Sequence, residues 1–193
     1  MKFIGRLLLC GLMTIALTVT LVRAALSNTP IQDKAIAALK AAYDKPNGKV
    51  YEHGGMIVEN QGTLRWVEPH PDNASRDSVY AVDRKSLLAG DTMVGTYHTH
   101  PCMTDYYVPY FSTADVILAY FTAVPAFILD ECTGDVHEFF SLVDDIHETG
   151  DDLPVRGAKC QRIIRHLPAG RIVGNIGEHD AAPHDNPDKD DCP

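Results

Sequence analysis

The sequence predicts one α/β domain over residues 27–172, built around a mixed or antiparallel sheet. Two segments with helical spacing of apolar residues are separated by several short strand patterns. The chain has 193 residues, of which 45% are hydrophobic, so it can bury one compact core but not two comfortable ones. Its formal net charge of −9 argues against a nucleic-acid binder, because phosphate recognition needs a basic face.

The first 24 residues have the layout of a secretory signal. Positive charges at the start are followed by an uncharged, mostly apolar stretch over residues 7–22, and Val-Arg-Ala at 22–24 resembles a cleavage site. The apolar stretch is slightly long for a signal and slightly short for a membrane span, so we expect a cleaved signal peptide or an uncleaved anchor. Both alternatives place the rest of the chain outside the cytoplasm, either periplasmic or secreted.

The first helix is predicted to start at Thr29, which can act as its cap, with Pro30 in the first helical position. Apolar residues at helical spacing continue to Tyr43, and the Lys-Pro-Asn-Gly cluster at 45–48 ends the helix. A second helix is predicted over residues 112–121. Strand patterns are predicted at 50–59, 63–67, 78–82, 92–99, 126–129 and 136–142.

Turn residues at 60–62 and 131–134 predict that the first and the last pairs of strands are hairpins. The acidic segment at 144–157 is predicted to be a loop, and residues 160–166 a short helix or strand. Residues 176–193 are acidic, contain proline and have almost no large apolar side chains, so we expect a disordered tail.

Four cysteines follow the predicted signal. In an oxidising compartment they can form two disulfides with three possible connectivities, and the sequence does not choose among them. They are Cys102, Cys132, Cys160 and Cys192. Cys102 keeps two alternatives, one half of a disulfide or a thiolate metal ligand, because it lies close to a pair of histidines.

These two histidines, His98 and His100, lie near the end of the strand predicted at 92–99. Side chains alternate between the faces of a strand, so both imidazoles point the same way, and Pro101 ends the strand beside them. Further along, Ser112 and Asp115 have the spacing of a helix cap and the third helical position. Two histidines and one carboxylate are typical of a catalytic zinc site, with a fourth position left for water.

Each of these features has a common alternative. A His-x-His pair in a strand is more often two solvent-facing residues, and Ser-x-x-Asp is more often only a helix cap. The order in which these features follow one another along the chain is more informative than any one of them. Glu52, then His98-x-His100-Pro, then Ser112-x-x-Asp115, resembles the JAMM (MPN-plus) metallopeptidases, and the Glu-x-Gly-Gly-x-Ile pattern that begins at Glu52 looks most like their bacterial relatives.

The resemblance covers residues 50–140 and implies a cytidine-deaminase-like fold, a curved mixed sheet flanked by helices. It implies that zinc is bound by the two histidines and Asp115, that Glu52 is the acid/base, and that Ser112 hydrogen-bonds the oxyanion. The implied function is an exported zinc-dependent peptidase or isopeptidase. Its substrate stays open among a peptide, a cell-wall crosslink and a ubiquitin-like tail.

One departure from the family concerns the loop between His100 and Ser112, which is longer than is common. Its tyrosines either line a substrate entrance or pack the loop against the domain; they are Tyr106, Tyr107 and Tyr110. Two other functions also remain open: a non-catalytic MPN-like binding module, and a secreted effector or toxin of the same fold. The oligomeric state is left open.

Overall fold

The computed structural model of the chain describes residues 29–69, 82–103, 111–140, 153–154, 163–164, 170–177 and 179–180. The predicted signal or anchor lies outside these residues, as do nearly all of the strand predicted at 78–82 and most of the acidic loop at 144–157. Among the helices of the described residues, none is both long enough and apolar enough to cross a membrane.

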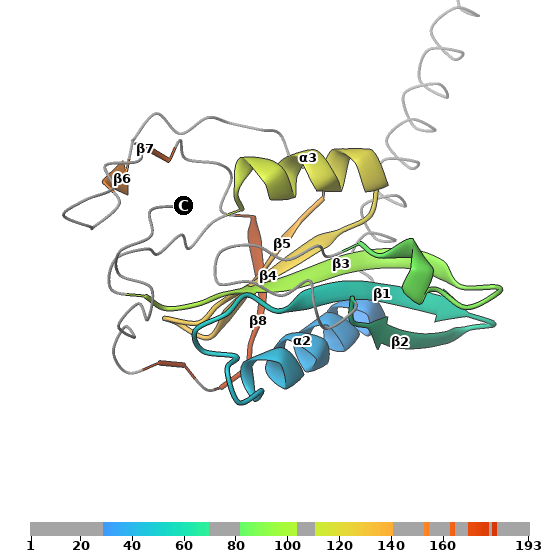
Figure 1. The fold of residues 1–193 in the computed structure, drawn as a ribbon, viewed down its shortest axis with the longest axis horizontal. Helices are drawn as coiled ribbons and strands as arrows, with labels where there is room; N and C mark the ends of the chain where they lie inside the picture. Colours follow the sequence, from blue (N-terminus) through green and yellow to red (C-terminus); the bar gives the residue numbers. More distant parts are fainter. Residues whose placement is uncertain are drawn as a thin grey trace, which may run out of the picture.

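A six-stranded mixed sheet forms the centre of the domain, in the order β2-β1-β3-β4-β5-β8 (Figure 1). Strands β3 and β4 are parallel, and the other neighbouring pairs are antiparallel. The α/β class predicted from the sequence is therefore confirmed. The elements are α2 (Thr29–Tyr43), β1 (Gly54–Asn60), β2 (Thr63–Val67), a 3-10 helix (Arg84–Ser86), β3 (Thr92–His100), α3 (Thr113–Thr122), β4 (Ala126–Asp130), β5 (Asp135–Phe139), β6 (Leu153–Pro154), β7 (Ile163–Ile164) and β8 (Arg171–Asn175).

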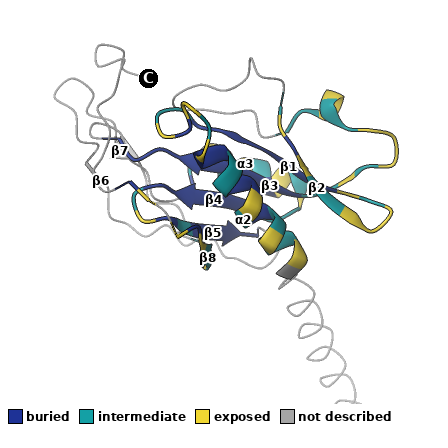
Figure 2. Cartoon of the chain, turned by 90° about the horizontal axis from the view of Figure 1, so that it is seen from below, coloured by how far each residue is buried: buried dark blue, intermediate teal, exposed yellow. Residues whose placement is uncertain are grey.

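The helices α2 and α3 cover opposite faces of this sheet (Figure 1). On one face, Leu39 of α2 belongs to a buried cluster with Tyr97 of β3. On the other face, Val116 of α3 packs in a cluster with Ile128 of β4. Figure 2 shows that the central strands are buried, while exposed residues gather on the outer sides of the helices and at the β1–β2 hairpin. The core is thus two apolar layers separated by the sheet.

Strand β1 begins later than the prediction of 50–59. The backbone N–H groups of Val50 and Tyr51 both donate to the carbonyl of Asn47, at 3.2 and 3.1 Å, and so close a turn after α2 instead of pairing with a neighbouring strand. The predicted hairpin itself is confirmed. Its two-residue loop, Gln61-Gly62, has positive φ at both positions, the backbone that suits the twist of a tight hairpin.

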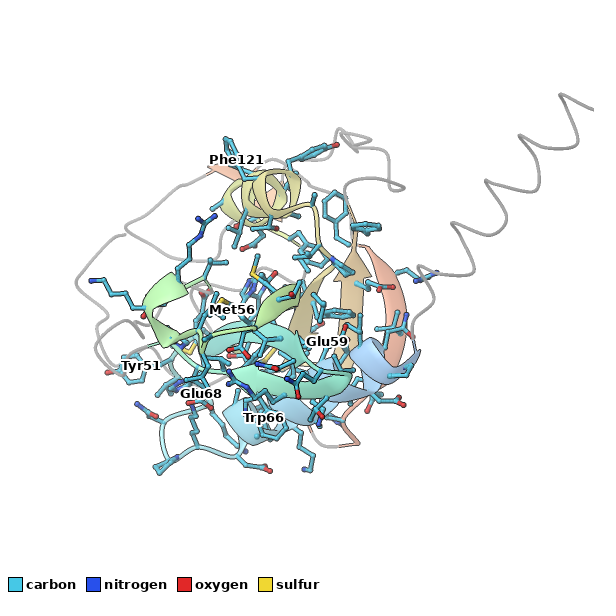
Figure 3. All side chains as sticks on the ribbon, turned by 90° about the vertical axis from the view of Figure 1, so that its right-hand side faces the viewer. Tyr51, Met56, Glu59, Trp66, Glu68 and Phe121 are labelled. Carbon is cyan, nitrogen blue, oxygen red and sulfur yellow. A yellow bond between two sulfur atoms is a disulfide. The ribbon has the colours of Figure 1, made fainter. Side chains whose placement is uncertain are left out.

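The connection from β3 to β4 explains why these two strands are parallel, because α3 carries the chain back along the sheet. As predicted, Ser112 is the N-cap of α3, and a capping box joins it to Asp115. The helix ends at Thr122, and its C-cap residue Ala123 adopts the left-handed conformation. Phe121, in the last turn, is 86% exposed, and Figure 3 shows it on the outer side of α3.

The C-terminal part corrects two predictions. Strand β8, which the sequence did not predict, adds to β5 at the edge of the sheet. Ile176 is buried in the α2-side core, and the N–H of Asp180 donates to the carbonyl of Glu131 at 2.9 Å. The domain therefore continues past residue 172, and the predicted tail starts too early because its first residues are held by long-range contacts. Residues 181–193 lie outside the described part.

Candidate metal centre

Strand β3 brings both predicted histidines to one end of the sheet. Its pairing with β4 aligns His98 with Ile128 and His100 with Asp130. Ile128 belongs to the apolar cluster under α3, whereas Tyr97 belongs to the apolar cluster under α2. Both histidines therefore share one face of the strand, as the alternation predicted, and the structure shows that this face is the one covered by α3.

Asp115 approaches the histidines from the first turn of α3. Its Oδ2 atom accepts a hydrogen bond of 2.6 Å from the backbone N–H of Ser112, and its own N–H donates to Ser112 Oγ at 3.2 Å. This capping box fixes the carboxylate at the positive end of the helix, where a negative charge is stabilised. The local sequence thus determines where the third side chain of the group points.

The three side chains converge at distances that suit one metal ion. Nε2 of His98 lies 2.9 Å from Nε2 of His100 and 3.2 Å from Oδ1 of Asp115, and His100 Nε2 lies 3.8 Å from Oδ2 of the same carboxylate. Ligands of a tetrahedral zinc ion, at about 2.0–2.2 Å from the metal, are separated by about 3.3–3.6 Å. The observed distances bracket this range. Among the described residues, this is the only group of three or more such side chains close enough to hold a metal ion.

The electrostatic environment of His98, His100 and Asp115 favours the binding of a cation. Both histidines are 6% exposed. Burial alone would lower the pKa of His98, but the Asp115 carboxylate outweighs it and raises that pKa above the usual range. Burial would likewise raise the pKa of Asp115, yet the adjacent imidazoles hold it well below its usual range. The carboxylate therefore stays ionised although only 16% of its side chain is exposed, and at such a site it needs positive charge beside it.

Glu52 lies next to this group, immediately before β1. Gly54 pairs with His98, and the N–H of Thr99 donates to the carbonyl of His53 at 2.8 Å. Continuing this antiparallel register sets Glu52 opposite His100, on the face that carries the metal group. Glu52 is 9% exposed, and its charge contributes to raising the pKa of His98.

The glycines after Glu52 have a structural explanation. A Cβ atom on Gly54 would lie 2.4 Å from the carbonyl oxygen of Tyr97 and 2.6 Å from Cβ of His98. Only glycine therefore allows β1 to approach β3 this closely beside the histidine. His53 is aligned with Thr99, which lies between the two histidines along β3, so His53 belongs to the opposite face of the sheet from the metal group. Burial and the charge of Lys45 lower its pKa.

Ser112 has a hydroxyl that can serve two purposes. Its oxygen accepts the N–H of Asp115 as a helix cap. A hydroxyl that accepts one hydrogen bond keeps its own proton to donate. The capping role therefore does not compete with donation to a developing oxyanion.

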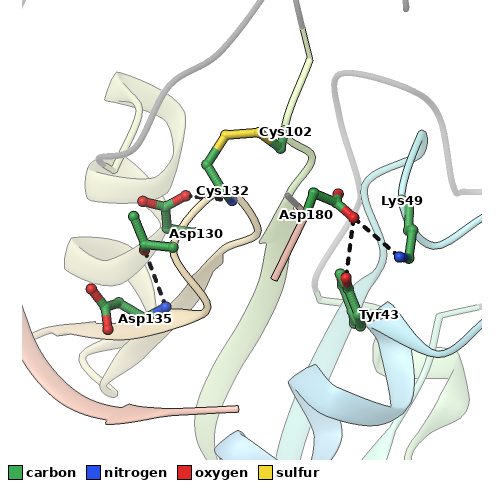
Figure 4. Close-up of a disulfide and its surroundings, with 8 residues drawn as sticks. Tyr43, Lys49, Cys102, Asp130, Cys132, Asp135 and Asp180 are labelled. Atoms are coloured by element: carbon green, nitrogen blue, oxygen red, sulfur yellow. Dashed lines mark hydrogen bonds and ion pairs between the residues drawn. A yellow bond between two sulfur atoms is a disulfide. The ribbon is translucent and has the colours of Figure 1, made fainter. Parts of the chain in front are cut away.

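A disulfide joins Cys102, two residues after His100, to Cys132 (Figure 4). It ties the segment after β3 to the turn between β4 and β5, with a Cα–Cα distance of 4.9 Å. Cys102 is thus half of a disulfide and, in this state, not a thiolate ligand. The predicted use of cysteines in disulfides is confirmed for this pair, and the other two cysteines lie outside the described residues.

A second, partly buried polar cluster lies on the α2 face, and sequence reasoning missed it. Asp180 Oδ1 accepts from the hydroxyl of Tyr43 at 3.1 Å and lies 3.1 Å from Nζ of Lys49 (Figure 4). Glu131 is fully buried nearby, and burial together with the charge of Asp180 raises its pKa to about 9. We call these four residues the α2-side cluster. Aspartate at 180 gives no local signal, because its partners are far away in the sequence.

The comparisons with known proteins add no identification. No protein-family model matches the chain, and no curated protein matches it. The function therefore has to be argued from the site itself.

Proposed function

We propose that this chain is an exported zinc-dependent peptidase or isopeptidase of the JAMM (MPN-plus) type, which hydrolyses an amide bond. The observation that carries the proposal is the convergence of His98, His100 and Asp115 at the end of β3, with Glu52 adjoining them. Two imidazoles and one carboxylate leave a position for water or substrate, as catalytic zinc sites do. Structural zinc sites instead fill all four positions with protein ligands.

Each residue of the site would have a separate role in amide hydrolysis. When bound, zinc would supply Lewis acidity and bring the pKa of a coordinated water molecule to about 7. Glu52 would take the proton from the attacking water and deliver it to the leaving amine. Ser112 would donate a hydrogen bond from its hydroxyl group to the oxyanion of the tetrahedral intermediate. Asp115, positioned by its capping box, would keep the histidines and the cation together.

Two further observations support the export of this enzyme. The apolar stretch at residues 7–22 has the layout of a signal or an anchor. The disulfide between Cys102 and Cys132 suits an oxidising compartment. A peptide or isopeptide substrate outside the cytoplasm is consistent with both.

The proposal is tested by metal analysis and by two variants. We expect purified protein to carry about one zinc ion per chain and His98→Ala to carry none. We expect Glu52→Gln to retain zinc but to lose about 10²- to 10⁴-fold of the hydrolysis rate on a peptide library. The matched control is Glu59→Gln, because Glu59 is exposed on β1 and should leave both quantities unchanged. Wild-type protein that binds no zinc would overturn the proposal, and a Glu52→Gln variant that keeps full biological activity would favour the binding-module alternative.

A further inference from the structure

A row of three polar residues crosses the sheet beside the metal group. His100 of β3 is aligned with Asp130 of β4, and Asp130 is aligned with Asp135 of β5. Residues aligned across neighbouring strands share a face, so all three point to the α3 side. Asp130 is only 3% exposed, whereas Asp135 is partly exposed. No local sequence pattern indicates a role for either aspartate.

The orientation of His100 means that its other ring nitrogen, Nδ1, requires a hydrogen-bond acceptor. The atom that faces His98 and Asp115 is Nε2. An imidazole that binds a metal through Nε2 is neutral and carries its proton on Nδ1, so Nδ1 must donate a hydrogen bond. In protein metal sites this donor is usually satisfied by a carboxylate, a backbone carbonyl or water. Asp130 is the carboxylate on the adjacent strand, at the same level as His100.

The position of the Asp130 carboxylate is itself held by the turn that follows. Its Oδ1 atom accepts the backbone N–H of Cys132 at 2.9 Å, and Cys132 is disulfide-bonded to the segment after His100 (Figure 4). A carboxylate has about four acceptor sites, so this bond leaves capacity for an imidazole N–H. The turn alone needs no charge at this position, because asparagine or serine would accept the same N–H. A buried charge is costly unless it is compensated, and a cation held by His100 would compensate it.

We propose that Asp130 is a positioning residue, which fixes the ring orientation and the Nδ1–H tautomer of His100 for metal binding. This inference rests on the proposed metal site. It adds an outer carboxylate to the set of residues on which metal affinity depends. The role of Asp130 also links the disulfide to the metal site. The N–H of Cys132 holds the carboxylate of Asp130, and its partner Cys102 follows His100 by two residues.

The test compares Asp130→Asn with the matched control Asp135→Asn. Asparagine at 130 retains one oxygen for the N–H of Cys132, so the turn is preserved, but it removes the charge and replaces the second acceptor oxygen by an NH₂ donor. We expect the zinc dissociation constant, measured by competition with a chelator, to rise about 10- to 100-fold in Asp130→Asn. The control should leave it unchanged, because Asp135 lies one strand further from His100 and accepts instead from Asn175 Nδ2 at 2.9 Å.

A second readout uses the zinc-loaded wild type and does not depend on a variant. With ¹⁵N-labelled histidine, NMR should show His100 as an Nδ1–H tautomer whose proton is protected from exchange with water. In Asp130→Asn this proton should exchange faster. An unprotected Nδ1–H in the wild type, or equal zinc affinities in wild type and Asp130→Asn, would overturn the role of Asp130 while leaving the metal site intact. Wild-type protein that binds no zinc would instead remove the proposed function on which the inference rests.

Discussion

The two faces of β3 carry buried polar groups of opposite character. On the α2 face, Asp180 is neutralised within the chain, because Lys49 lies 3.1 Å from it. On the α3 face, Asp115 lies 3.2 and 3.8 Å from two imidazoles but has no lysine or arginine within ion-pair distance in the described part of the chain. The pair of Asp180 and Lys49 is neutral as it stands, whereas the group around Asp115 gains a compensating charge only when a cation or protons arrive. This difference separates a polar group that stabilises a fold from one that can bind a ligand.

Removing one carboxylate from each face gives the largest expected contrast. We expect Asp115→Asn to weaken zinc binding by more than about 100-fold, a larger effect than the loss of an outer-shell partner. Asp180→Asn should leave zinc binding unchanged and reduce only stability, because its partners Tyr43 and Lys49 lie on the other face. Isothermal titration of both variants with zinc measures the contrast. Equal losses of zinc affinity would show that the two clusters are not independent.

The disulfide lies between the two faces at the end of the sheet, so its loss should affect both. The bond between Cys102 and Cys132 closes a loop with a sequence separation of 30 residues. A loop of this length corresponds to about 3–4 kcal/mol of stabilisation in the chain-entropy account. We expect the double substitution of both cysteines by serine to lower the free energy of unfolding by about this amount in urea titrations. Wild-type protein reduced with a dithiol is the second measurement, and an unchanged unfolding midpoint in both samples would contradict the prediction.

Glu131 distinguishes the faces through the pH dependence of stability. Burial raises its pKa in the folded protein to about 9, whereas an ordinary glutamate titrates near 4.5. Between these values the folded state holds a proton that the unfolded state has released, so stability falls as the pH rises from about 5 to 9. We expect Glu131→Gln to remove this decline and to be more stable than wild type at pH 8, by on the order of 1 kcal/mol or more.

The same measurement has an internal control. Glu59→Gln makes the same chemical change at an exposed position of β1 and should leave the pH dependence of unfolding as it is in the wild type. Urea unfolding at pH 5 and pH 8 compares the three proteins. A Glu131→Gln variant that is less stable than the wild type at pH 8 would contradict the prediction. It would mean that the folded state stabilises an ionised Glu131.

The local elements were predictable from the sequence because local rules decide them. Alternation along a strand placed His98 and His100 on one face, and the Ser-x-x-Asp spacing placed Asp115 in the first turn of α3. Turn residues located the β1–β2 hairpin. In each case the determining contacts lie within a few residues along the chain. The predicted start of β1 was wrong for a related reason, since hydrogen bonds from Val50 and Tyr51 to Asn47 competed with strand pairing.

Tertiary structure alone decided the features that depend on distant partners. It selected the pairing of Cys102 with Cys132, added β8 to the sheet and drew Asp180 into the α2 face. It also aligned Asp130 with His100, although 29 positions intervene in the sequence. Sequence by itself thus determined which residue types could bind a metal and on which local elements they lie. The distances between them, and the carboxylate beside them, came from parallel pairing of β3 with β4 and the packing of α3 above, which bring together side chains that no local pattern connects.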